Sequence, residues 1–170
     1  MNRKIFEWSV RFFSENKTAY NILRFVYKVL PLVIFIAYPL LLVYVYFNSL
    51  KDLNKLMMVP LWVFVGVTIL RVLVNETRPY ERYGKPSVFK KDTVGKSFPS
   101  RHTASAFVIA MAFLYVNVPI GIAALLIALL IEISRILAGA HYIHDVVAGM
   151  AIGIFFGWLL IFAVDIFAVL

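Results

Sequence analysis

Five apolar segments constrain the fold of this chain more than any other feature of its sequence. They cover about residues 29–47, 56–74, 102–116, 120–137 and 143–167, and a helix that crosses a bilayer needs roughly 20 mainly apolar residues. Hydrophobic residues make up 62% of the 170 positions and charged residues only 15%, which leaves too little polar surface for a water-soluble protein. The sequence therefore predicts an all-α integral membrane bundle of about five transmembrane helices, forming a single domain over residues 1–170.

The first 28 residues differ from the rest because charged residues recur every few positions. Phe6 and Phe13 lie on one helical arc, whereas Lys4 lies on the opposite one, and this pattern is typical of an amphipathic helix. We expect residues 1–28 to lie on the membrane interface and residues 29–170 to form the bundle. A cleavable signal peptide is excluded, because no continuous apolar core precedes a small-residue cleavage site.

The balance of charge limits the partners and the chemistry. The net charge is +8, and a basic membrane protein favours anionic lipid head groups or a phosphorylated substrate over nucleic acid. The chain has no cysteine, which excludes disulfides, thiolate-bound zinc and a thiol nucleophile. Catalysis would have to depend on other side chains.

Polar residues gather at helix ends that alternating topology places on one membrane face. They are Arg71, Arg78, Ser100, Arg101, His102, Ser134, Arg135, His141, His144 and Asp145. Ionisable groups near lipid are costly unless they are paired or used, so this cluster is a candidate functional site. The 24-residue stretch 75–98, rich in loop-type residues, is the expected active-site loop.

The residue types in this cluster favour phosphoryl transfer. Arginine binds phosphate oxygens through two nitrogens and keeps its charge, although a single interfacial arginine can equally bind lipid head groups. His141 and Asp145 are four residues apart on one helix face, so the carboxylate can orient the imidazole, with a purely structural hydrogen bond as the alternative. His102 is a separate candidate acid. Few carboxylates and much positive charge argue against a metal, so neither a metal nor another cofactor is expected.

Three motifs in this cluster resemble the tripartite signature of the type 2 phosphatidic acid phosphatase superfamily. They read Arg71-x6-Arg78-Pro79, Pro99-Ser100-Arg101-His102 and Ser134-Arg135-x5-His141-x3-Asp145. The resemblance covers residues 71–145 in the family's order. It implies a metal-independent membrane lipid phosphatase acting on undecaprenyl pyrophosphate or phosphatidylglycerophosphate, with phosphatidate as a third candidate.

The resemblance also implies roles for individual residues. His141 would be the nucleophile that forms a phosphohistidine, Asp145 its orienting partner and His102 the acid for the leaving group. The phosphate oxygens would be held by Arg71, Arg78, Ser100 and Arg135. Two positions depart from the family pattern, because Arg71 replaces a lysine and Arg101 replaces a glycine. Arg101 has two alternative roles, either a contact to the phosphate or a contact to lipid head groups.

Several further residues have two interpretations. Glu132 precedes Arg135 by three positions on one helix, which predicts an ion pair, with a proton relay as the alternative. His144 lies outside the motif spacing and suits an assisting or structural role. The loop lysines can recognise a second phosphate or the membrane surface, or only solvate the loop; they are Lys85, Lys90, Lys91 and Lys96.

The last apolar segment carries a glycine at every fourth position, namely Gly149, Gly153 and Gly157. Small residues at this spacing allow another helix to approach closely. We expect packing within the monomer, with a homodimer seam as the alternative.

The distribution of basic residues and the resemblance disagree on membrane orientation. Of the 17 Lys and Arg, only Lys51 and Lys55 lie on the side opposite the site, so the positive-inside rule favours a cytoplasmic site. The bacterial relatives that the motifs resemble mostly act at the outer face, and basic residues that attract a phosphorylated lipid would mislead the rule. We expect an outward-facing site.

Two other classes of protein can use a similar arginine cluster. A non-catalytic protein that binds or transports anionic lipids or phosphate needs the arginines but not the two histidines. A vanadate-dependent haloperoxidase could use the same oxyanion cradle, but the short chain and its lipid-facing helices argue against it.

Overall fold

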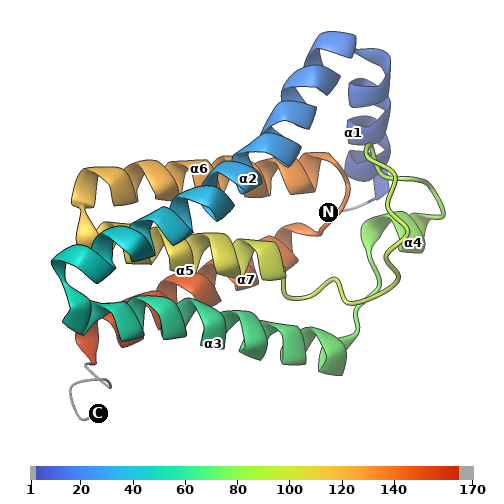
Figure 1. Ribbon diagram of the computed structural model, residues 1–170. Helices are drawn as coiled ribbons and strands as arrows, with labels where there is room; N and C mark the ends of the chain where they lie inside the picture. Colours follow the sequence, from blue (N-terminus) through green and yellow to red (C-terminus); the bar gives the residue numbers. More distant parts are fainter. Residues whose placement is uncertain (1–2, 165–170) are drawn as a thin grey trace.

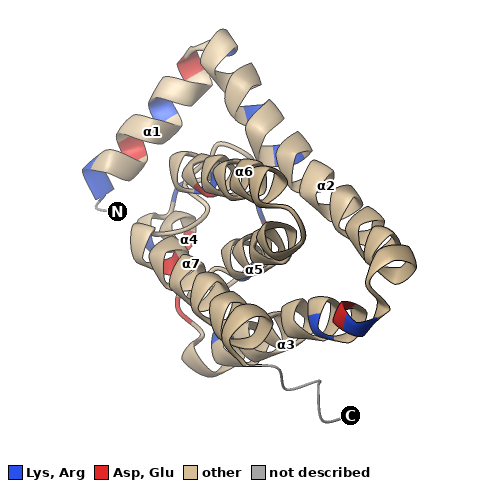
Figure 2. Ribbon diagram, turned by 90° about the vertical axis from the view of Figure 1, so that its left-hand side faces the viewer, with Lys and Arg blue, Asp and Glu red and all other residues tan. Residues whose placement is uncertain are grey.

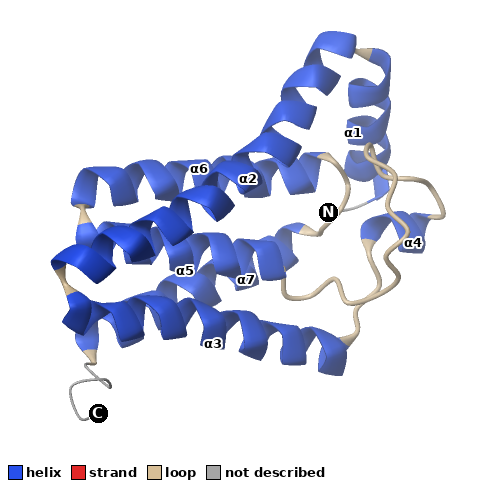
Figure 3. Cartoon of the chain, in the orientation of Figure 1, coloured by secondary structure: helices blue, strands red, loops and turns tan. Residues whose placement is uncertain are grey.

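The structure is a computed structural model that describes residues 3–164, and it is helical with no strand in that range (Figure 3). Four helices are long and apolar enough to cross a membrane, and a fifth apolar helix is shorter. The predicted all-α membrane bundle is therefore confirmed. The elements in chain order are α1 (Arg3–Glu15), α2 (Lys17–Asn48), α3 (Leu50–Val74), α4 (Pro79–Tyr83), α5 (Arg101–Val116), α6 (Val118–Leu137), α7 (Ile143–Gly157) and the π-helical turn η1 (Trp158–Ala163).

The first membrane helix begins much earlier than the predicted boundary at residue 29. Asn16 caps α2, because its side chain accepts a hydrogen bond from the backbone N–H of Ala19 at 3.0 Å, which satisfies one free donor of the first turn. Residues 17–28 therefore continue the first apolar segment in one helix, and their predicted place at the membrane interface stays a prediction. The end of the last predicted segment, 165–167, lies outside the described residues.

Helix α1 packs on the rest of the protein, and its predicted place at the membrane interface stays a prediction. Phe6 is fully buried, and a Cβ atom on Gly139 would come within 2.5 Å of its ring. Glu7 forms an ion pair with Lys85 at 3.0 Å, and the Ser9 hydroxyl donates to a backbone carbonyl at the end of α6. Figure 1 shows α1 beside α4 and the loop that follows it.

Helix α5 lies at the centre of the bundle, with α2, α3, α6 and α7 around it (Figure 2). Two glycines of α7 bring the two backbones into contact, since a Cβ on Gly149 would lie 2.6 Å from the carbonyl oxygen of Ser100 and one on Gly153 would lie 2.6 Å from that of Ala104. The glycines therefore pack within the monomer, as expected. A homodimer stays a prediction.

The C-terminal ends of α3 and α6 and the N-terminal ends of α5 and α7 lie at the same end of the bundle (Figure 1). Backbone hydrogen bonds join them, including Ser100 N–H to Asp145 O at 2.9 Å and Val88 N–H to Ala138 O at 3.0 Å. The sequence prediction that the polar helix ends share one face is confirmed.

Candidate active site

The His141–Asp145 pair forms the buried centre of the site. His141 lies in the turn between α6 and α7, and its Nδ1 is 3.3 Å from Oδ2 of Asp145, with both side chains almost fully buried. The same oxygen accepts hydrogen bonds from the Ser97 hydroxyl at 2.5 Å and from the Tyr142 backbone N–H at 2.9 Å. Asp145 is thus fixed from three directions, and Nε2 is the nitrogen of His141 that remains for another partner.

His141 is a neutral imidazole near pH 7. Burial and the positive charge of Arg78 together lower the pKa of His141 to about 4, although the hydrogen bond to Asp145 opposes the shift. A neutral ring that donates from Nδ1 to a carboxylate carries its lone pair on Nε2. His141 is therefore prepared to act as a nucleophile or base.

His102 approaches the site from another helix, in the first turn of α5. His102 is exposed and lines a large groove. It lies within electrostatic reach of Arg135, Lys91 and His141. The structure thus brings both candidate histidines to one site from separate elements, as the motifs required.

Two of the candidate arginines are held by backbone carbonyls and leave their charges uncompensated. Arg71 donates to the carbonyl oxygen of Pro99 at 3.2 Å, and Arg78 donates to those of Gly95 at 3.0 Å and Ala140 at 3.5 Å. Within residues 3–164 neither guanidinium forms an ion pair with a carboxylate. Buried cations without counter-charges attract an anion strongly.

Arg135 and its surroundings contain polar atoms without partners. Its guanidinium carbon lies 4.8 Å from the ring centre of Tyr27. Buried atoms that lack a hydrogen-bond partner among the described residues include Nε of Arg135, the Ser100 hydroxyl and the Tyr27 hydroxyl. Such atoms are costly to leave unsatisfied, and each of the three can donate a hydrogen bond to an acceptor.

The predicted ion pair between Glu132 and Arg135 is wrong. Glu132 is fully buried, but its carboxylate accepts a hydrogen bond from the Thr103 hydroxyl at 2.5 Å, while Arg135 turns to Tyr27. Spacing of three residues on a helix places two side chains near each other without fixing which partner each one chooses. Glu132 therefore joins α6 to α5 at Thr103, the residue that follows His102.

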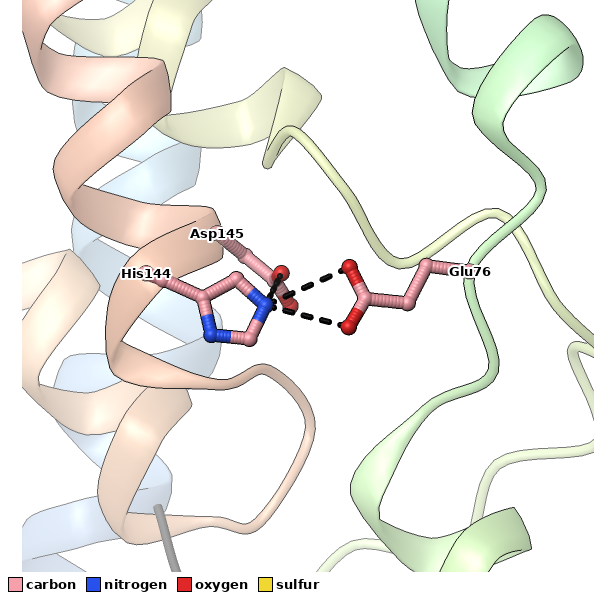
Figure 4. Close-up of side chains that lie close together, drawn as sticks. All are labelled: Glu76, His144 and Asp145. Atoms are coloured by element: carbon pink, nitrogen blue, oxygen red, sulfur yellow. Dashed lines mark hydrogen bonds and ion pairs between the residues drawn. The ribbon is translucent and has the colours of Figure 1, made fainter.

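The remaining histidine joins the loop to α7. His144 Nε2 lies 3.1 Å from Oε1 of Glu76 and 3.1 Å from Oδ1 of Asp145 (Figure 4), and its ring stacks on Tyr142. Each of the three residues has one possible metal-ligand atom, and these atoms lie within 4.8 Å of one another. Nε2 of His144 and the Glu76 carboxylate already contact each other. The contacts fit the supporting role predicted for His144.

Sequence reasoning missed Ser97, Glu76 and Tyr27. Ser97 lies two residues before the second motif, and Glu76 lies between the two arginines of the first, so their nearness to motifs was the available signal. Tyr27 is far from every motif in the chain and carried no such signal.

An apolar groove leads to the site from the membrane-spanning surface. Its volume is about 800 Å³, and residues of α2, α3, α5 and α6 line it. Pro31, Phe35 and Phe64 are among its apolar wall residues, whereas His102 and Arg135 contribute to its polar part. The groove is therefore apolar along the membrane-spanning helices and polar where His102 and Arg135 lie.

The fold and this cluster define an integral membrane protein that gathers histidines and arginines at one end of a helical bundle. The sequence model of the PAP2 superfamily matches residues 53–166, well over half of the chain, and the chain therefore belongs to that superfamily. The family resemblance drawn from the three motifs is confirmed.

Individual relatives agree with this assignment. Undecaprenyl-diphosphatase BcrC of Bacillus subtilis (strain 168) is 34% identical over 104 residues, which cover 56% of this chain and 54% of that protein. Lipid A 1-phosphatase of Rhizobium johnstonii is 34% identical over 105 residues, which cover 57% of this chain and 42% of that protein. The crystal structure of Aquifex aeolicus LpxE superposes with a TM-score of 0.58 at 25% identity, covering 82% of this chain and 92% of that one. The chain thus spans about half the length of the curated relatives it matches.

Proposed function

We propose that this protein is a metal-independent lipid phosphatase that removes the terminal phosphate of a lipid phosphate or diphosphate through a phosphohistidine on His141. The observation that carries the proposal is a neutral histidine, fixed by Asp145, in one site with the buried Arg71 and Arg78. Among residues 3–164 neither guanidinium forms an ion pair with a carboxylate. The charge developing on a transferring phosphoryl group is what such arginines stabilise.

The geometry supports a two-step reaction. In the first step Nε2 of His141 forms a bond to phosphorus, the bond from phosphorus to the lipid oxygen breaks, and a proton from His102 goes to that oxygen. In the second step a water molecule attacks the phosphorus and gives a proton to His102, the bond from Nε2 of His141 to phosphorus breaks, and inorganic phosphate leaves. Arg71, Arg78 and Arg135 hold the phosphoryl oxygens in both steps, with the Ser100 hydroxyl as a further donor.

The groove supports a lipid substrate that reaches the site sideways from the bilayer. Its apolar walls belong to membrane-spanning helices, so an acyl or prenyl tail can stay in an apolar environment while its head group reacts. Undecaprenyl pyrophosphate and phosphatidylglycerophosphate are the leading candidates, and phosphatidate is a third. The names of the relatives, an undecaprenyl-diphosphatase and a lipid A 1-phosphatase, agree with a lipid substrate.

The proposed membrane face of the site is the outer one. The side of the membrane on which loop 84–100 lies would test it, because that loop lies at the same end of the bundle as His141. Labelling of a single cysteine placed at exposed Lys90 by a membrane-impermeant reagent in intact cells supports the proposal. Labelling only after cell lysis contradicts it.

Release of inorganic phosphate by the detergent-purified protein in EDTA tests the activity. The substrates are undecaprenyl pyrophosphate, phosphatidylglycerophosphate, phosphatidate and a soluble sugar phosphate, with His141→Ala beside the wild type. Release from a lipid that disappears in the variant supports the proposal. No release from any lipid by the folded wild-type protein contradicts it and favours a non-catalytic anion-binding protein.

A further inference from the structure

A second group of cations lies next to the proposed phosphate-transfer site, on the loop and on α5. Lys91 places its Nζ 5.4 Å from the ring centre of Tyr27, the same ring against which Arg135 lies. Arg101 lines the groove beside His102 and lies 4.9 Å from the ring centre of Phe64. The proposed two-step transfer uses neither cation.

Lys91 is held in place by its neighbours in the loop. The Val88 N–H donates to Ala138 O at 3.0 Å, and the ring of Phe89 packs 4.7 Å from that of Tyr27. These contacts fix the chain two or three residues before Lys91 against α2 and the end of α6. The half-buried position of Lys91 is therefore a consequence of the loop's packing.

Lys91 has no counter-charge. It forms no ion pair with a carboxylate in the part of the chain that the structure describes. Burial, together with the positive charges of Arg135, Arg78 and Arg71, lowers the pKa of Lys91 to about 8. A lysine kept among three arginines at such a cost is typical of a site that binds additional negative charge.

We propose that Lys91 and Arg101 form a second phosphate subsite beside His102, which binds the phosphate that stays on the lipid when a lipid diphosphate is cleaved. This inference rests on the proposed function and narrows its substrate class to diphosphates. Nε2 of His141 bonds to the terminal phosphorus, the bond from that phosphorus to the bridging oxygen breaks, and the electron pair remains on the bridging oxygen. His102 gives that oxygen a proton, and the lipid monophosphate departs.

The chemistry of the leaving group distinguishes the two substrate classes. A phosphate monoester such as phosphatidate leaves a neutral alcohol once the oxygen is protonated, and two cations beside His102 have nothing to bind. A diphosphate leaves a phosphate, whose charge both cations can bind. His102 is the reference point, because the leaving oxygen must lie next to the acid and the second phosphate is attached to that oxygen.

The test compares two substrates with one tail, farnesyl diphosphate and farnesyl monophosphate, on the full-length purified protein. Lys91→Met should lower kcat/KM about tenfold or more on the diphosphate but less than about threefold on the monophosphate, as expected for loss of one charge-assisted contact to a single phosphate. Lys90→Met is the matched control, because Lys90 is the exposed neighbour in the same loop, and both of its values should equal those of the wild type. Lys91→Arg keeps the charge and should retain the preference for the diphosphate.

Each result has a separate meaning. Equal losses on the two substrates for Lys91→Met, or no loss on either, overturn the second subsite while leaving the phosphatase intact. Hydrolysis of neither substrate by the wild-type protein contradicts the proposed function itself. If Lys91→Met does not fold, competition decides on the wild type: inorganic pyrophosphate should inhibit monophosphate hydrolysis about tenfold more strongly than inorganic phosphate, and equal inhibition overturns the proposal.

Discussion

Buried cations have different partners at the two ends of the bundle. At the α2–α3 end, where Figure 2 shows acidic and basic bands side by side, Lys55 pairs with Asp52 at 2.9 Å and donates to the Tyr115 hydroxyl at 2.8 Å. At the other end, the hydrogen-bond partners that Arg71 and Arg78 have among residues 3–164 are backbone carbonyls. A cation whose charge is compensated stabilises the fold, whereas one whose charge is left open is available for a ligand.

The largest expected effect follows from removal of the nucleophile at the open end. His141→Ala should lower kcat by about a thousandfold or more, because alanine supplies no nitrogen in place of the proposed nucleophile. Phosphate release from a lipid diphosphate measures the effect, and a thermal melt shows that the protein is folded. His141→Gln, closer in volume, should be equally inactive. Turnover at the wild-type rate by either folded variant would remove His141 from the chemistry.

Removal of the proposed acid should have an effect that depends on the leaving group. His102→Ala should lower kcat by about a hundredfold or more on a lipid monoester, because its alkoxide needs a proton to depart. With p-nitrophenyl phosphate, whose leaving group needs no proton, phosphoenzyme formation should be nearly unchanged. The ratio of single-turnover rates on the two substrates is the measurement, and equal losses on both contradict the assignment.

A matched pair of substitutions tests the comparison between the two ends directly. Arg135→Met should lower kcat/KM by about a hundredfold, since it removes a phosphate contact, and should change the melting temperature little. Lys55→Met should leave kcat/KM near that of the wild type but lower stability by about 3 kcal/mol, because it leaves the buried Asp52 carboxylate without its positive counter-charge. If both variants lose stability and activity in parallel, the two ends do not differ in function.

The smallest effect is a displaced acid limit in the pH profile. Protonation of Nε2 abolishes the nucleophile, so the active fraction falls as the pH decreases through the pKa of His141, which burial lowers to about 4. The rate at pH 5.5 should therefore stay near its plateau, whereas an imidazole of ordinary pKa, about 6.5, would already be mostly protonated. Rates of phosphate release, corrected for the separately titrated ionisation of the substrate, measure this. A limb centred at 6.5 after that correction contradicts a neutral, buried nucleophile.

Much of the fold could be predicted from the sequence, because apolar segments of membrane-crossing length specify helices with little dependence on distant residues. The convergence of the motifs followed from alternating topology alone. The docking of α1 could not be foreseen, since it depends on the fit of Phe6 against Gly139, which are far apart in the chain. The start of the first apolar helix was placed too late, at residue 29, because the charges of residues 17–28 outweighed the capping signal of Asn16.

The candidate site was predictable in its residues but not in their partners. The motif spacing predicted the His141–Asp145 contact, because i, i+4 positions share a helix face. The same rule gave the wrong partner for Glu132, since Thr103 on a neighbouring helix competes for its carboxylate. The bond from Ser97 to Asp145 joins a loop to a helix, and such contacts are decided by packing.

The central claim is that the unpaired arginines hold a phosphoryl group that is transferred to His141. The most direct measurement is to mix the protein with a substrate carrying a radiolabelled terminal phosphate, quench in alkali, where phosphohistidine survives, and locate the label by peptide mass spectrometry. The account predicts label on His141 in the wild type, none in His141→Ala and strongly reduced labelling in Arg135→Met. Label on another residue, or rapid turnover with no labelled protein at any time, would contradict it.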